Sequence, residues 1–187
     1  MVDAFKAIVV LVLIIIGFIV YPAARIADRS DDVARHAASS AVEEFADTVR
    51  GKGYIAARDY ETLRARLDGT GLVFEVQLEH YRRTIQPVYS DPNNSSTFQN
   101  RYTIEYVGSF SKDILDRIYP TPGTFEASRP ADDLVRRYPM HAGDLLQVRV
   151  QSRGTTLGSR LQGMLFGQTA EVPILAAAGG MVRSEAP

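Results

Sequence analysis

The residues best suited to acid–base or metal chemistry are few and scattered. The chain contains three histidines, His36, His80 and His141, and no cysteine. No two of the histidines are spaced as two ligands of one metal ion on a helix would be. A chain without cysteine also has no disulfide, thiolate ligand or cysteine nucleophile. We expect each histidine to lie on the surface or at a sheet edge, and we predict no metal and no cofactor.

Motifs for phosphate binding or acyl transfer are also missing. The sequence contains no GxxxxGK[ST] or GxGxxG loop and no GxSxG elbow. Asp91, Asn93 and Ser95 alternate as the first ligands of a calcium loop do, but Ser96 replaces the turning glycine and Tyr102 stands at the glutamate position. We therefore predict a protein that is not an enzyme. A tethered hydrolase is the weakest hypothesis, because no nucleophile and base can be paired.

Composition limits the possible partners. The chain has 187 residues with 21 basic and 22 acidic side chains, for a net charge of -1. A nearly neutral chain has no net field that would attract nucleic acid. We therefore predict no nucleic-acid partner.

An apolar run dominates the N-terminus. Between Lys6 and Arg25 lie 18 residues without a charge, and a helix of that length measures about 27 Å, close to the hydrocarbon thickness of a bilayer. This run predicts a membrane span at about residues 7–24 and a single-pass protein with an extracytoplasmic C-terminal domain. A cleaved signal peptide is the alternative, although the run is longer than the usual apolar core of such peptides.

The segment that follows is rich in alanine and amphipathic. No glycine or proline occurs from Arg25 to Arg50, so we expect one long helix over residues 1–50 and a head domain over 51–187. Ile26, Val33, Ala37 and Ala41 share one apolar stripe. A wider face is expected to bury against the head; it comprises Val42, Phe45, Ala46 and Val49.

The head has the pattern of an α+β domain. Alternating apolar residues predict strands over 72–81, 102–106 and 144–152, with the first two antiparallel. Short helices are expected over 58–67, 111–119 and 156–167, and a long loop over 83–100. Gly179-Gly180 predicts a tight turn or a bulge in an edge strand. Together these elements predict a small antiparallel β-sheet head with short helices, carried on a long N-terminal membrane helix.

This layout resembles the type IV pilin superfamily, including the pseudopilins and the Tad-type minor pilins. The apolar run 8–20, the pair Tyr21-Pro22 and the alanine-rich half to Arg50 carry the resemblance. Members have an N-terminal helix that is anchored in the membrane and later packs in a filament core. The resemblance implies a structural subunit of a pilus-like surface filament. Its partners would be copies of itself, the bilayer before assembly, and pilus or secretion assembly machinery.

The resemblance also implies roles for single residues. Members typically carry a glutamate at the fifth mature position after a cleaved leader, whereas here Phe5 occupies position 5 and the acid is Asp3. Asp3 would pair with a neighbouring amino terminus or with Lys6 and set the subunit register; alternatively, it only favours the helix dipole. Pro22 would let the helix bend on assembly, or kink it at the membrane surface. Helix packing is expected at Ile8, Val12, Ile15, Ile19, Val33, Ala37 and Ala41.

A second hypothesis uses the same elements differently. The chain would then be a membrane-anchored component of a pilus or secretion machine that binds a partner and does not polymerise. The predicted loop over 83–100 or an exposed strand edge would be the binding surface.

Overall fold

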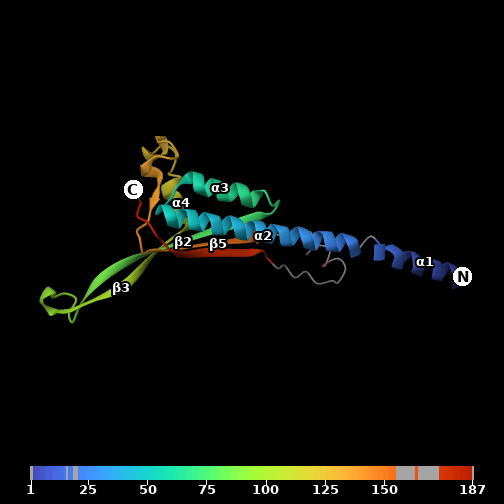
Figure 1. Cartoon of the computed structure of the whole chain (residues 1–187), viewed down its shortest axis with the longest axis horizontal. Coiled ribbons are helices and arrows are strands. Elements are labelled where there is room, and N and C mark those ends of the chain that lie inside the picture. The colour runs from blue at the N-terminus through green and yellow to red at the C-terminus, as the bar shows by residue number, and fades with distance from the viewer. Residues whose placement is uncertain (1, 16, 19–20, 155–162, 164–172, 187) are drawn as a thin grey trace.

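The computed structural model describes residues 2–15, 17–18, 21–154, 163 and 173–186. Figure 1 shows a body of helices packed on a sheet, with helix α1 extending from one end and a β-hairpin from the other. The chain is α+β with two antiparallel sheets. The helix predicted over 156–167 and the packing residue Ile19 lie outside the described residues.

The N-terminal region forms two described helices, α1 (Val2–Ile15) and α2 (Tyr21–Lys52). Among the described residues, no helix is both long enough and apolar enough to cross a membrane. The 14 residues of α1 correspond to about 21 Å, whereas a bilayer core measures about 30 Å. The predicted membrane helix is therefore wrong, and with it the single-pass localisation.

Pro22 is the second residue of α2. In the first turn of a helix the backbone N–H has no partner within the helix, so proline costs little there. The structure describes two helices, α1 and α2, in place of the one long helix predicted over residues 1–50. The predicted role of Pro22 in bending or kinking that helix stays a prediction. Beside it, the Tyr21 hydroxyl accepts a hydrogen bond of 3.1 Å from Nε of Arg25.

The C-terminal half of α2 is part of the head. Its core-facing residues recur every three or four positions and are almost fully buried; they are Ala34, Ala38, Ala41, Val42, Phe45, Ala46 and Val49. The predicted burial of Val42, Phe45, Ala46 and Val49 is confirmed. The helix stops where Gly53, with φ of 77°, donates its N–H to the carbonyl of Val49 at 2.9 Å.

The main sheet has the strand order β3-β2-β5-β6. Its strands are β2 (Val73–Tyr89), β3 (Phe98–Phe110), β5 (Leu145–Arg153) and β6 (Leu175–Met181), all antiparallel. A second sheet pairs β1 (Tyr54–Ile55) with β4 (Tyr138–Pro139). The antiparallel pairing of the first two predicted strands is confirmed.

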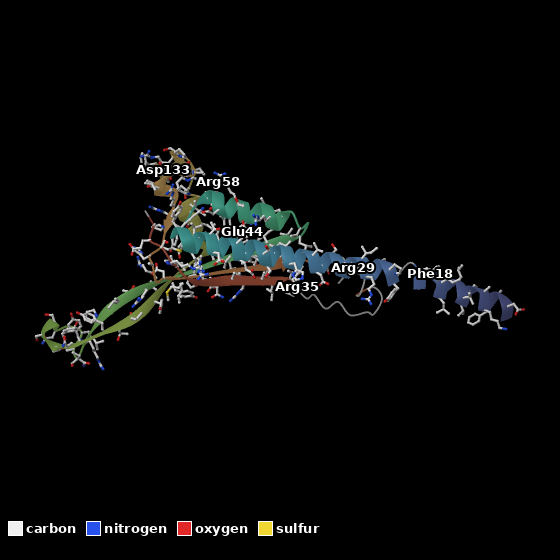
Figure 2. All side chains as sticks on the ribbon, viewed as in Figure 1. Phe18, Arg29, Arg35, Glu44, Arg58 and Asp133 are labelled. Atoms are coloured by element: carbon white, nitrogen blue, oxygen red, sulfur yellow. The ribbon has the colours of Figure 1, made fainter. Side chains whose placement is uncertain are left out.

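The core lies between the main sheet and the helices. Alternate residues of β2 and β5 face the helices, and they are Phe74, Val76, Leu78, Leu146, Val148 and Val150. Helix α3 (Ala57–Asp68) lies beside α2 (Figure 1) and adds Leu63 and Leu67 to the core. Helix α4 (Ser111–Ile118) adds Ile114 and Ile118. Figure 2 labels Glu44 on α2, whose carboxylate pairs with Arg66 of α3.

Gly179 and Gly180 form neither a turn nor a bulge. Both lie inside β6, paired in regular register with Gln147 and Leu146 of β5. A Cβ at Gly179 would collide with the carbonyl oxygen of Leu146, and one at Gly180 would meet the guanidinium of Arg50. The glycines therefore permit close approach of β5 and of α2.

The predicted loop over 83–100 is wrong for most of its length. Strand β2 continues to Tyr89, and β3 starts at Phe98, with the 3-10 turn Ser95–Thr97 between them. Strand β5 pairs with β2 only up to Tyr81, so the outer part of the hairpin is a two-stranded arm. Figure 1 shows this arm projecting beyond the body. Turn-forming residues in 83–100 predicted a loop, but most of this segment is extended because β2 and β3 pair through it.

Candidate functional site

The first candidate surface is the side of α1. Predicted packing residues Ile8, Val12 and Ile15 are 42–60% exposed. Helix α1 makes no extensive contact with any other described element. Figure 2 labels Phe18, which follows α1 and is 80% exposed. These apolar side chains are therefore largely exposed and make no extensive contact with another described element.

The predicted stripe on α2 divides into two parts. Val33 and Ala37 are exposed, as is Ile26, whereas Ala41 is buried in the core. Small side chains beside Val33 and Ala37 leave a groove of about 430 Å³ next to the end of α3; its lining includes Ser30, Ala34, Ser40, Gly69 and Thr70. The N-terminal part of the stripe is therefore available to a second molecule, and its C-terminal part is not.

Asp3 and Lys6 lie on the first turns of α1. Oδ1 of Asp3 is 3.9 Å from Nζ of Lys6, and the side chains are 99% and 71% exposed. An exposed ion pair of this kind contributes little to stability. The carboxylate is also in the first turn, where the helix dipole favours it. Both partners remain accessible to a second molecule.

A buried polar cluster lies inside the head, around His80. Nε2 of His80 is 2.9 Å from Oδ2 of Asp144, and Nδ1 is 2.9 Å from the hydroxyl of Tyr138. Asp144 also accepts hydrogen bonds from the backbone amides of Arg83 (2.9 Å) and His141 (2.8 Å). His80 is only 3% exposed, so its predicted surface position is wrong. The cluster joins β2, β4 and the start of β5.

The electrostatics fix the proton positions in this cluster. Burial lowers the pKa of His80 and outweighs the raising effect of Asp144, so the imidazole is neutral at pH 7. Burial alone would raise the pKa of Asp144, but the hydrogen bonds from His141, Arg83 and His80 give a net lowering. The ionised carboxylate accepts only, so Nε2 of His80 carries the proton and Nδ1 accepts from Tyr138.

Tyr138 remains protonated in the same cluster. Burial raises the pKa of its phenol, more than Ser109 and Arg82 lower it. Both ring nitrogens of His80 are engaged, so no nitrogen is free to take a proton from Ser109, which faces His80 across the β2–β3 pair. Each buried polar group of the cluster has a hydrogen-bond partner, so the cluster has the features of a structural link between strands.

The other histidines lie at the surface, as predicted. His141 is largely exposed, with Nδ1 3.8 Å from Oδ2 of Asp144. His36 is exposed on α2. No group of three or more potential metal ligands occurs in the described ranges. At the tip of the arm, Oδ1 of Asp91 accepts from the amide of Asn93 at 3.0 Å, which is a local turn contact.

The arm carries the second exposed apolar surface. Ile85, Tyr102, Ile104 and Tyr106 are 47–65% exposed. Ile85 lies directly opposite Ile104 in the ladder, so these residues share one face of the ribbon. Strand β3 is also an edge of the main sheet. Face and edge together offer side chains and free backbone groups to a partner.

Comparison with known proteins adds no relative. No protein family, no curated protein and no solved structure matches this chain. The resemblance to the type IV pilin superfamily therefore stays a prediction.

The His80 cluster was missed although one signal was available. Phe74, Val76 and Leu78 alternate on the inward face, and His80 continues that period of two. A histidine at that position is inward-facing and needs polar partners. The partner Asp144 lies 64 residues away in the chain, so its identity required the tertiary structure.

Proposed function

We propose that this protein is a non-enzymatic structural subunit that packs against copies of itself through α1, in a pilus-like assembly. The exposure of the apolar side chains of α1 supports this proposal most directly. Nine large apolar residues of this helix are at least 42% exposed, namely Phe5, Ile8, Val9, Val10, Leu11, Val12, Leu13, Ile14 and Ile15. An apolar patch of this kind marks an interaction surface.

The energetic scale is sufficient for association. Burying an apolar side chain of this size contributes about 1.5–3 kcal/mol. Loss of free translation and rotation on association costs about 4–15 kcal/mol. Burial of five or more of the α1 side chains between neighbouring helices is therefore of the size that association requires. Val33 and Ala37 of α2 are exposed as well and could add to such a contact.

Asp3 and Lys6 have a place in this proposal. Their mutual contact is long and exposed, so an exchange of partners with a neighbouring subunit costs little. Between packed apolar helices the carboxylate requires a cation, because an unpaired charge in apolar surroundings is costly. Asp3 would therefore select the axial register of neighbouring copies.

The chain contains no cysteine, so a single introduced cysteine can be crosslinked without interference from other thiols. Ile8→Cys places one thiol on α1, and Arg64→Cys places one on the exposed side of α3 as a matched control. A short bis-maleimide should join Ile8→Cys copies into dimers at concentrations where Arg64→Cys stays uncrosslinked. Adding Asp3→Ala to Ile8→Cys should lower the yield of crosslinked dimer. Equal crosslinking of the Ile8→Cys and Arg64→Cys proteins would refute packing through α1.

The arm favours a second candidate function, in which the protein binds a different partner and does not polymerise. The exposed face with Ile104 and Tyr106 and the free edge of β3 support it. A photocrosslinking residue at Ile104 should then capture one partner species, and the same residue at Glu105, on the opposite face, should not. Capture at both positions alike would count against binding by this face.

A further inference from the structure

A pocket of about 330 Å³ opens beside the buried His80 cluster. Four parts of the chain line it: β2 with His80 and Arg82, β3 with Ser109, α4 with Asp113 and Arg117, and the segment 138–141. His80 and Ser109 lie opposite each other in the β2–β3 ladder, and Arg82 is two residues along β2, so all three share one face of the sheet. The fold thus brings distant polar residues to one concave place.

Two arginines of this pocket have no partner within the described part of the chain. Neither Arg82 nor Arg117 makes a side-chain hydrogen bond or ion pair with another described residue. Other arginines of the head are paired: Arg66 with Glu44, Arg153 with Glu75, and Arg50 with Asp47. A guanidinium is a planar donor suited to carboxylate and phosphate oxygens. Two such groups at one pocket therefore favour an oxyanion.

The remaining lining is compatible with one bound anion. Burial lowers the pKa of His80, so its neutral ring adds no charge to the pocket. The Asp144 carboxylate behind it is held by hydrogen bonds from His80 and from the amides of Arg83 and His141. Asp113 is the opposing charge on the wall, and its Oδ2 already accepts a hydrogen bond from the amide of Phe110 at 3.2 Å. The two guanidinium groups and the one carboxylate of the lining leave a formal excess of one positive charge.

We propose that this pocket binds the carboxylate or phosphate group of a small organic molecule, held by the guanidinium groups of Arg82 and Arg117. The pocket volume of about 330 Å³ lies at the lower end of the range for small-molecule sites, roughly 300–1,000 Å³. Ser109 lines the same wall, where its hydroxyl hydrogen-bonds to Tyr138. This site is separate from the helix surface of α1 and does not depend on self-association.

The test is titration of the full chain with inorganic phosphate and, separately, with acetate, followed by calorimetry and by two-dimensional NMR. At least one anion should bind with a stoichiometry of one and shift the amide signals of Ser109 and His141. Arg82→Gln and Arg117→Gln should each weaken the affinity by about tenfold or more. Arg64→Gln, which removes the same charge from the exposed side of α3, should leave the affinity unchanged.

Each outcome decides the proposal. Tighter binding of phosphate assigns a phosphate-bearing ligand, and tighter binding of acetate assigns a carboxylate-bearing one. Binding of neither anion overturns the proposal, as does an equal loss of affinity in Arg64→Gln and Arg82→Gln, which would indicate nonspecific attraction. Circular dichroism of each variant verifies the fold, since both pocket arginines are exposed. Crosslinking through α1 is measured separately, so its result is independent.

Discussion

Nε2 of His80 donates a hydrogen bond of 2.9 Å to Oδ2 of Asp144, with both side chains at most 4% exposed. The contact fastens the inner end of the β2–β3 hairpin to the start of β5. The two residues belong to different parts of the chain, and neither is exchangeable for an apolar residue without leaving the other unpaired. The stability of the head should therefore depend on this pair.

Asp144→Asn should destabilise the head by about 2–4 kcal/mol. Oδ1 accepts from Arg83, and Oδ2 accepts from both His80 and His141. An amide has one oxygen and places an NH2 group against at least one of these donors. Urea unfolding followed by circular dichroism measures the loss, with the exposed Asp116→Asn as control. A loss below that of Asp116→Asn would contradict the role of this carboxylate.

His80 should make stability depend on pH. Burial lowers its pKa in the folded state below 6.5, so the unfolded chain binds the proton more readily. Its contribution is complete above about pH 6.5 and is lost as the pH falls through the lower, folded-state pKa. Asp144 acts in the same direction at lower pH, because its folded pKa lies below 3.8.

The measurement is the melting temperature between pH 8 and pH 5. The original chain should lose stability across this range, and His80→Gln should be less stable at pH 8 but change less with pH. His36→Gln removes an exposed histidine of α2 and should follow the original chain. Parallel pH profiles for the original chain and His80→Gln would assign the acid sensitivity to other groups.

Two glycine substitutions should have opposite effects. Gly179→Ala forces a methyl group against the backbone of Leu146 in β5 and should cost about 2–4 kcal/mol. Gly51→Ala adds a methyl group in open space near the end of α2 and should be neutral or stabilise by up to about 1 kcal/mol. Thermal unfolding of both variants tests the pair. Similar effects at the two positions would refute close packing of β6 on β5.

The arm should be dispensable for folding. Gln86 and Thr103 are paired in the ladder, so replacing 87–102 with Asn-Gly closes the hairpin with a two-residue turn. The removed residues lie outside the core cluster, and the melting temperature should therefore change by less than about 4 °C. A much larger fall, measured by thermal unfolding of the shortened and full chains side by side, would show that the arm supports the head.

The helices and strands of the head and their buried faces could largely be predicted from the sequence. The helical spacing of Val42, Phe45 and Val49 can be read from the residues alone, and so can the alternation of Val148 and Val150. Each spacing shows which face of a helix or strand is buried. The period of a helix or strand depends only on nearby residues. The short helices before Gly69 and after Phe110 also follow from nearby residues.

One wrong prediction concerns the apolar N-terminal run, and another concerns a segment whose structure depends on pairing with a second strand. A run of 18 uncharged residues predicted a membrane span, but the described helix α1 ends at Ile15. Turn-forming residues near Pro87 and Asn93 predicted a loop, whereas pairing with β3 supplies hydrogen bonds that extend β2 to Tyr89. Hydrogen bonding between strands is a nonlocal term, and it overrides weak local preferences.

The sequence by itself determined the α+β class of the head, its amphipathic helices and its inward-facing strand residues, because these follow from periodic burial. Only the tertiary structure decided that His80 meets Asp144 and Tyr138, that Gly179 lies against Leu146, and that Arg82 and Arg117 line one pocket. Those contacts join residues far apart in the chain. Their partners are selected by the strand register and by the packing of α4 beside the sheet, which no local pattern encodes.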